Sequence, residues 1–331
     1  MPPAPKTPEA PEALDTLATE ARREGGAEID LLPTVELARL MNAEDRTVPE
    51  AVAAALPAIA AAVDAIVERM RRGGRLVYAG AGTAGRLGVL DASECPPTFD
   101  TAPGQVVGLI AGGPAALTSA LEGAEDDRAA AVADLAALDL TAADTVIGVS
   151  ASGRTPYALA AVEHARALGA LTVALVGNRG SALGEAAEHR IEVVTGPELL
   201  AGSTRLKAGT AQKLVLNTVS TIVMVRLGKT YGDLMVDLRA TNAKLRARSR
   251  RIVAVATGAA PADADAALAA TGGRAKDAIL LLLAGVDAPT AAALLARHGG
   301  VLRDALRDAP PGTLCEAPPG APPGAPGDAP G

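Results

Sequence analysis

The sequence is poor in aromatic residues and contains no tryptophan. One phenylalanine and three tyrosines form the whole aromatic set, 1% of 331 residues. Without aromatic platforms on which bases or sugar rings could stack, we expect any ligand to be held mainly by hydrogen bonds. An excess of basic residues is also absent, since the formal net charge is −7 and the isoelectric point is about 5.2. Both deficits argue against nucleic acid as a partner.

Cysteine, histidine and uninterrupted hydrophobic runs are scarce as well. Cys95 and Cys315 lie far apart, and the three histidines are scattered without metal-ligand spacing. Neither a disulfide framework nor a metal site is therefore predicted, and Cys95 is interpreted as a buried packing residue. The first residues lack the apolar core of a signal peptide, and charges interrupt every alanine-rich stretch. We expect a cytoplasmic protein that does not enter a membrane.

The two ends of the chain are rich in proline, alanine and glycine. Residues 1–13 and 309–331 cannot bury enough apolar surface to offset their ordering entropy, so both are predicted to be disordered. Thr34 and Thr47 are typical helix N-caps, and Glu50 would complete a capping box with Thr47. This pattern predicts two helices before the first strand, the second running from about residue 48 to 72.

Short apolar runs alternate with helical stretches through the middle of the chain. The predicted strands are Leu76–Ala79, Val106–Ala111, Thr145–Ser150, Leu171–Val176 and Ile191–Val194. This alternation predicts an α/β fold, a doubly wound parallel sheet with helices on both faces. We assign residues 14–255 to this domain, including its N-terminal helices, a long helix over 209–227 and a turn over 228–232.

After Thr257 the pattern is purely helical. Helices are predicted over residues 263–270, 274–283 and 290–298, separated by turns that contain glycine. We interpret residues 256–308 as a small three-helix domain of the UBA-like kind.

The first predicted strand leads into a glycine-rich segment, Gly80 to Gly85, at the start of a helix. Backbone N–H groups at such a helix N-terminus can bind a phosphate, and Gly82 and Thr83 are the candidate ligands. The segment also satisfies the dinucleotide pattern G-x-G-x-x-G. That reading requires an acid at the end of the next strand, whereas Asp100 has the spacing but precedes that strand.

A second polar loop follows the third predicted strand. Its candidate ligands are Ser150, Ser152, Gly153, Arg154 and Thr155. The three hydroxyls and the backbone around the glycine could surround one phosphate. Alternatively, Thr155 caps the next helix and the serines bond the turn. Two such loops at the carboxyl ends of strands in one sheet favour a phosphorylated small molecule as the ligand.

Acidic residues near these loops are candidates for proton transfer. Glu94 stands just before Pro96 and Pro97, which are expected to stiffen the chain and lead it out of the helix. Glu122 and Glu125 lie in a second acidic segment. Spacing alone favours a solvated carboxylate at a helix end for Glu94, and the segment with Glu122 and Glu125 could be an exposed N-terminal helix turn. Lys207, and less so Lys213, could reach a phosphate or carboxylate.

Several blocks of the sequence resemble the N-acetylmuramic acid 6-phosphate etherases, which carry the sugar isomerase (SIS) fold and are similar to animal glucokinase regulatory proteins. The matching blocks are Gly80–Thr98, Glu122–Asp126, Ala151–Tyr157, Gly202–Lys213, Leu234–Asp237 and Ala240–Leu245. The resemblance spans roughly residues 16 to 307 in unbroken order. Its most specific part is the block from Asp91 to Pro97.

The resemblance implies a lyase that needs no cofactor. Such an enzyme would eliminate D-lactate from the 6-phosphorylated muramic sugar and add water, giving N-acetylglucosamine 6-phosphate during cell-wall recycling. The family's proton donor falls on Glu94, expected to be partly buried beside Leu90 and Pro96, and its second acid on Glu125. A homodimer is implied too, because SIS sites commonly borrow residues across subunits.

One residue departs from the family pattern. Ala84 stands where the family usually has a serine, so one hydroxyl ligand to the phosphate is missing. Two other functions share the same fold. A non-catalytic sugar-phosphate sensor would not need both Glu94 and Glu125. A sugar-phosphate isomerase would not be expected to carry the block before Pro97, and a DNA-binding regulator would need a basic helix-turn-helix that the sequence lacks.

Overall fold

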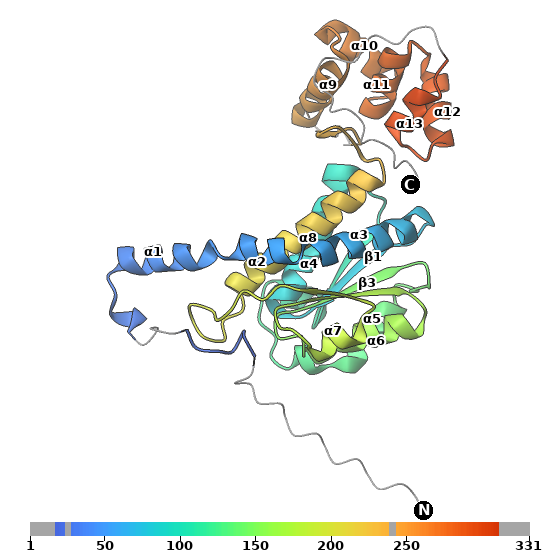
Figure 1. Cartoon of the computed structure of the whole chain (residues 1–331). Coiled ribbons are helices and arrows are strands. Elements are labelled where there is room, and N and C mark those ends of the chain that lie inside the picture. Colours follow the sequence, from blue (N-terminus) through green and yellow to red (C-terminus); the bar gives the residue numbers. More distant parts are fainter. Residues whose placement is uncertain (1–16, 24–27, 238–242, 311–331) are drawn as a thin grey trace, which may run out of the picture. The chain divides into compact units, whose positions relative to one another are not determined.

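The computed structural model describes residues 17–23, 28–237 and 243–310 (Figure 1). The predicted disorder of residues 1–13, and of all but the first two residues of 309–331, lies outside this part of the chain. The described residues divide into two compact units. The first holds the residues up to Ser93 together with Pro103–Thr221, and the second holds Glu94–Ala102 together with the residues from Ile222 onward.

The first unit is built on a five-stranded parallel sheet with the order β2-β1-β3-β4-β5. Its strands are β1 (Leu76–Gly80), β2 (Val106–Ile110), β3 (Thr145–Ser150), β4 (Leu171–Val176) and β5 (His189–Glu192). The predicted parallel α/β sheet is confirmed, with β3 and β4 at the predicted bounds. The fifth strand begins two residues earlier than expected.

Helices cover both faces of this sheet, as its uniformly apolar strands predict. Val77 and Ala79 of β1 belong to a core cluster with Leu135 of α5 (Arg128–Ala136) and Ala161 of α6 (Pro156–Ala167). Side chains alternate between the two faces of a strand, so Tyr78 points the other way. There it faces α4 (Gly82–Phe99), since a Cβ on Gly88 would lie 2.9 Å from the Cβ of Tyr78.

The helices before β1 differ from the prediction. A 3₁₀ helix, η2 (Ile29–Leu31), and α1 (Thr34–Asp45) precede α2 (Val48–Ala54) and α3 (Leu56–Arg71). The single helix expected over 48–72 is wrong, because Pro57 has no N–H to continue the ladder and the chain breaks at Ala55. The capping box is wrong too. The Thr47 hydroxyl donates to the Glu44 carbonyl at 2.8 Å instead of capping the helix. The predicted N-cap at Thr34 is also wrong, because Pro33 holds the N-cap position and Thr34 is the first residue of α1.

The second unit contains more helices than predicted. After α8 (Lys207–Arg226), a hairpin of β6 (Thr230–Tyr231) and β7 (Leu234–Met235) replaces the expected turn. The three predicted helices correspond to α10 (Pro261–Ala270), α11 (Ala275–Ala284) and α12 (Ala288–Arg297). Two further helices, α9 (Ala243–Thr257) and α13 (Leu302–Arg307), share their hydrophobic core. The three-helix count was therefore too low.

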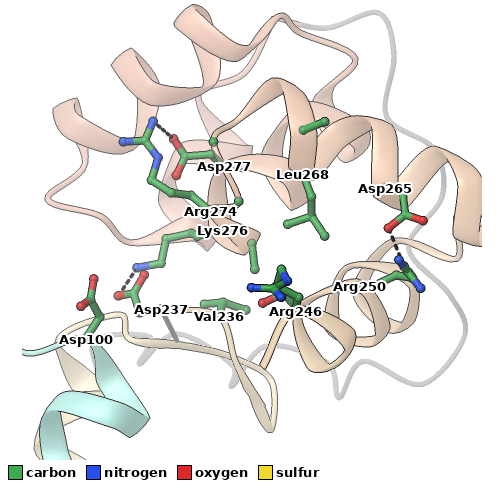
Figure 2. A pocket seen from close by; sticks show the side chains of 15 residues that line it. Asp100, Val236, Asp237, Arg246, Arg250, Asp265, Leu268, Arg274, Lys276 and Asp277 are labelled. Atoms are coloured by element: carbon green, nitrogen blue, oxygen red, sulfur yellow. Dashed lines mark hydrogen bonds and ion pairs between the residues drawn. The ribbon is translucent and has the colours of Figure 1, made fainter. Parts of the chain in front are cut away.

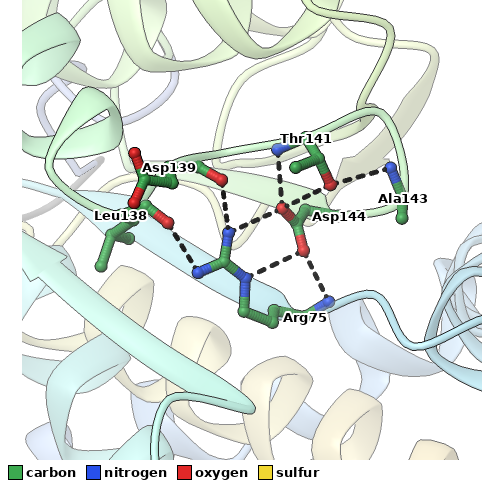
Figure 3. A network of polar contacts seen from close by, with 6 residues as sticks. All are labelled: Arg75, Leu138, Asp139, Thr141, Ala143 and Asp144. Atoms are coloured by element: carbon green, nitrogen blue, oxygen red, sulfur yellow. Dashed lines mark hydrogen bonds and ion pairs between the residues drawn. The ribbon is translucent and has the colours of Figure 1, made fainter.

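A polar network fastens the amino edge of the sheet (Figure 3). Arg75, just before β1, donates from Nε to Asp144 Oδ1 at 3.0 Å and from Nη2 to Oδ2 at 2.8 Å. Its guanidinium also donates to the carbonyls of Leu138 and Asp139. Asp144, just before β3, accepts the backbone N–H groups of Arg75 and Thr141 as well. The network ties the entries of two neighbouring strands together.

Within the described ranges, no single helix is long and apolar enough to cross a membrane, although three bent pairs of helices would pass on length and composition.

Candidate functional site

The two predicted anion loops lie side by side at the carboxyl edge of the sheet. β1 and β3 are neighbours, and Gly80 pairs with Val149 just before the two loops begin. The chain leaves β1 for β2 on one side, while β3 lies on the other, so the strand order reverses between the loops. Ligands of open α/β sheets bind at such a reversal. The predicted placement of both loops at one edge is confirmed.

The hydroxyls of the second loop converge. Ser150 is buried, and its Oγ lies 2.8 Å from Thr155 Oγ1 and 3.3 Å from Ser152 Oγ. Gly153 N donates to Ser150 Oγ and Arg154 N donates to Ser152 Oγ. The serines thus bond the turn, as the alternative interpretation required. The threonine does not act as its cap, because its hydroxyl turns to Ser150 instead of the first turn of α6.

Gly153 fixes the shape of this loop. Its φ is +73°, and a Cβ there would lie 2.3 Å from Ser181 Oγ. Its carbonyl accepts from Leu183 N at 3.0 Å, which ties the loop to the segment after β4. Asn178 adds a second tie by donating to the Ala151 carbonyl at 3.0 Å. The loop is held rigidly, as a binding loop on a preformed site requires.

The first loop is the opening turn of α4 rather than a separate loop. Gly82 begins the helix with φ +53°, and a Cβ on Gly85 would lie 2.7 Å from the Gly80 carbonyl, so the helix lies close on β1. Thr83 is half-buried next to the start of α8, where a Cβ on Gly209 would lie 3.3 Å from its methyl group. Ala84, at the position of the missing hydroxyl, is buried.

Glu94 lies in a helix that continues past the two prolines. α4 runs through Pro96 and Pro97 to Phe99, so the extended exit predicted for this segment is wrong. It stops at Asp100, which has φ +49° and donates its N–H to the Pro96 carbonyl. The expected partial burial of Glu94 is not found in the described chain, since its side chain is exposed. Both prolines fall in the last turn, where only two intrahelical bonds are lost.

Cys95, next to Glu94, is 2% exposed, which confirms its interpretation as a packing residue.

Glu125 lies in a short 3₁₀ helix, η4 (Ala124–Asp126), after β2. Its side chain is exposed, as is that of Glu122. α5 begins later, at Arg128, and Asp127 caps it by accepting from Ala130 N at 2.9 Å. Glu125 therefore lies exposed in the first turn of η4, as the alternative interpretation of this segment expected, and precedes α5. Its neighbour Ala124 packs against the core cluster that contains Tyr157.

Lys207 is buried at the start of α8 and already has an anionic partner. Its Nζ donates to Glu44 Oε2 at 2.8 Å, and Glu44 also pairs with Arg23. The hydrogen bond from Lys207 lowers the pKa of Glu44. Glu198 caps α8 by accepting from Lys207 N and Ala208 N. The contact of Lys207 with substrate stays a prediction. To bind a substrate phosphate or carboxylate, the Lys207 amine would have to give up its bond to Glu44.

Sequence reasoning missed Asp91. It is only 5% exposed, and it accepts from Tyr78 Oη at 2.8 Å, Asn217 Nδ2 at 2.6 Å and Ser220 Oγ at 3.0 Å. A signal was present, because the buried face of α4 is a regular helical stripe in which this aspartate stands. The buried residues of α4 are Ala84, Gly85, Gly88, Asp91, Ala92, Cys95 and Phe99.

A separate cavity of about 780 Å³ lies in the second unit (Figure 2). Lys276 on its wall is buried, and its Nζ bonds Asp237 at 2.7 Å and the carbonyls of Gly228 and Gly300. Burial lowers the pKa of Lys276. Two further ion pairs lie on the wall, Arg250 with Asp265 and Arg274 with Asp277. The residues that line it do not include any of the predicted site residues. Its Arg250–Asp265 pair joins α9 to α10.

The fold and the paired loops define a SIS-domain protein. The SIS domain model matches residues 127–221, and the model of the glucokinase regulatory protein N-terminal SIS domain matches residues 58–166. The chain belongs to the N-acetylmuramic acid 6-phosphate etherase family. It is 73% identical over 292 residues to the protein of that name from Streptomyces coelicolor, covering 88% of this chain and 94% of the relative.

Two further proteins with the same name are also similar to this chain over most of its length. The etherase from Streptomyces avermitilis is 71% identical, with 89% of this chain and 95% of the relative covered. The etherase from Rubrobacter xylanophilus is 60% identical, with 88% and 96% covered. Family membership therefore extends over both compact units.

Proposed function

We propose that this protein is an N-acetylmuramic acid 6-phosphate etherase. It cleaves the lactyl ether of its substrate and releases D-lactate and N-acetylglucosamine 6-phosphate, in the recycling of cell-wall amino sugars. The observation that carries the proposal is identity of 60–73% to relatives of that name over nearly their whole length. The two hydroxyl-bearing loops at one edge of the sheet suit a sugar phosphate.

The phosphate binds at the two loops. Gly82 and Thr83 lie at the N-terminus of α4, and Ser150, Ser152 and Thr155 precede α6. The first turn of a helix carries N–H groups without intrahelical partners and the positive end of the helix dipole, and both favour a bound anion. In the second loop, the backbone N–H groups of Gly153 and Arg154 are further donors for the phosphate. In the structure they donate to the hydroxyls of Ser150 and Ser152.

The reaction is an elimination followed by an addition. In the open-chain sugar the C2 proton is acidified by the neighbouring aldehyde. Its removal forms the C2–C3 double bond as the C3–O bond to lactate breaks, and the lactate oxygen takes a proton. Water then adds its oxygen to C3 and a proton to C2. Glu94 protonates the leaving oxygen and afterwards activates the water, and Glu125 takes the second proton-transfer role.

The enzyme acts in the cytoplasm as a homodimer, with residues contributed to each site across the subunit interface. Both Glu94 and Glu125 are exposed in a single chain. General acids work best where water is excluded, so a second copy that covers them would complete the site. Light scattering of the purified protein should give twice the chain mass of 32.9 kDa.

The direct test is incubation of the purified protein with N-acetylmuramic acid 6-phosphate and an enzymatic assay for free D-lactate. Release of lactate with formation of N-acetylglucosamine 6-phosphate supports the proposal. Binding of the sugar phosphate without lactate release would point to the non-catalytic sensor. An aldose–ketose interconversion without loss of lactate would point to an isomerase. Either result overturns the etherase assignment.

Restoring the missing hydroxyl with Ala84→Ser should lower KM by up to roughly tenfold with little change in kcat. A neutral hydrogen bond contributes about 0.5–1.5 kcal/mol, and binding would gain it in ground and transition state alike. Steady-state kinetics on the lactate assay measures the effect. Ser152→Ala serves as the opposite change and should raise KM. A KM that rises or stays constant in Ala84→Ser would remove position 84 from the phosphate site.

A further inference from the structure

We propose that Asp91 is a positioning residue that fixes the segment of α4 carrying Glu94. The inference rests on the proposed function, because it assigns Asp91 a role through the proton donor. Glu94 follows Asp91 by three residues, less than one turn later in the same helix. Asp91 faces the interior, whereas Glu94 faces outward. Because residues three apart project about 60° apart around a helix axis, the orientation that Asp91 imposes on α4 also sets the direction of Glu94.

This part of α4 needs an anchor from outside the helix. Proline has no N–H, so Pro96 and Pro97 cannot donate to the carbonyls of Ala92 and Ser93. Two consecutive bonds of the i to i−4 ladder are lost immediately around Glu94. A helix weakened there can bend or rotate unless side chains hold it.

The contacts of Asp91 supply that anchor on two sides. Oδ2 accepts from Tyr78 of β1, and Oδ1 accepts from Asn217 and Ser220 of α8. Three bonds of 2.6–3.0 Å to a strand and a neighbouring helix restrain both the translation and the rotation of α4. Asp91, Tyr78, Asn217 and Ser220 belong to the first unit together with the phosphate loops, and Glu94 is the first residue of the part of α4 that is assigned to the second unit.

A carboxylate is an unusual choice at this position. The other members of the buried stripe of α4 are alanine, glycine, cysteine and phenylalanine. Burying a charge carries a large desolvation cost, and apolar replacements of buried ionic groups are often neutral or stabilising. Packing alone would therefore be served by a small apolar side chain. The carboxylate is explained by its directional hydrogen bonds, which select one orientation of the helix.

The test compares Asp91→Asn with Asp144→Asn. Both aspartates are buried and multiply hydrogen-bonded, but Asp144 lies at the amino edge of the sheet, away from the loops. We expect Asp91→Asn to lower kcat by roughly 10- to 100-fold, with KM within about twofold, because misplacement of a reacting group by about 1 Å has an effect of this size. Asp144→Asn should lower the melting temperature without changing kcat at temperatures where it is folded.

A double-mutant cycle with Glu94→Gln supplies a readout that a purely structural role would not move. If Asp91 acts through Glu94, the double variant is no slower than Glu94→Gln alone. Additive losses, or an unchanged kcat in folded Asp91→Asn, would overturn the positioning role. A wild-type protein that releases no lactate would instead overturn the proposed function itself. The two failures are therefore distinguishable.

Discussion

Glu94→Gln is expected to slow the release of D-lactate by about 10²–10⁴-fold, the usual cost of removing a general acid. The amide keeps the size of the side chain and stays on the exposed face of α4, so the helix is not disturbed. It cannot give a proton to the departing lactate oxygen, and it cannot activate the water that follows. Both half-reactions should therefore slow, and kcat should fall with KM nearly unchanged. Initial rates from the lactate assay measure the effect.

The second acidic segment offers a matched comparison for this result. Glu122 and Glu125 are both exposed and lie three residues apart, yet only Glu125 is assigned to proton transfer. Glu125→Gln should lower kcat, whereas Glu122→Gln should leave it within about twofold. Equal rates for wild type and Glu94→Gln would remove Glu94 from its role. A large loss in Glu122→Gln would show that the segment is sensitive to any change of charge.

The strands were predictable because a parallel sheet covered on both faces leaves continuous apolar runs in the sequence. β3 and β4 are buried along their whole length, and their bounds were predicted correctly. β5 was placed two residues too late. Among the strands of the described chain it pairs only with β4, and its His189, Arg190 and Glu192 retain solvent contact. An edge strand of this kind can begin with polar residues that an apolar pattern does not include.

The polar contacts that anchor the site could not be predicted, because they join distant segments. Asn217 is 126 residues from Asp91, and Lys207 is 163 residues from Glu44. The hydroxyls that converge in the second loop are close in sequence, since Ser150 and Thr155 are only five residues apart. Their cluster could therefore be predicted from the sequence. The path of α4 through its prolines was missed because local propensity argues against it. The packing of Asp91 and Cys95 outweighs that preference.

Asp144→Ala should lower the free energy of unfolding by about 3–5 kcal/mol, the cost of breaking a buried ion pair by removing one partner. Asp144 is 2% exposed, and it holds Arg75 with both carboxylate oxygens (Figure 3). Its removal leaves two backbone N–H groups at the amino edge without their acceptor. Denaturant titration followed by circular dichroism measures the loss. Arg128→Ala, which breaks the exposed pair with Glu163, should cost at most about 1 kcal/mol.

The same pair predicts how stability depends on pH. Burial alone would raise the pKa of Asp144, but the hydrogen bonds from the Arg75 side chain and from the backbone of Thr141 and Arg75 outweigh burial and lower it. A carboxyl group with a lowered folded-state pKa stabilises the protein above its unfolded pKa of about 3.9, and this contribution is lost as the pH falls through the folded-state pKa. The difference in melting temperature between wild type and Asp144→Asn should therefore be constant near neutral pH and shrink below about pH 4. A difference that persists unchanged into strong acid would mean that the side chain stabilises the strand entries by shape and neutral hydrogen bonds, and that its charge contributes nothing.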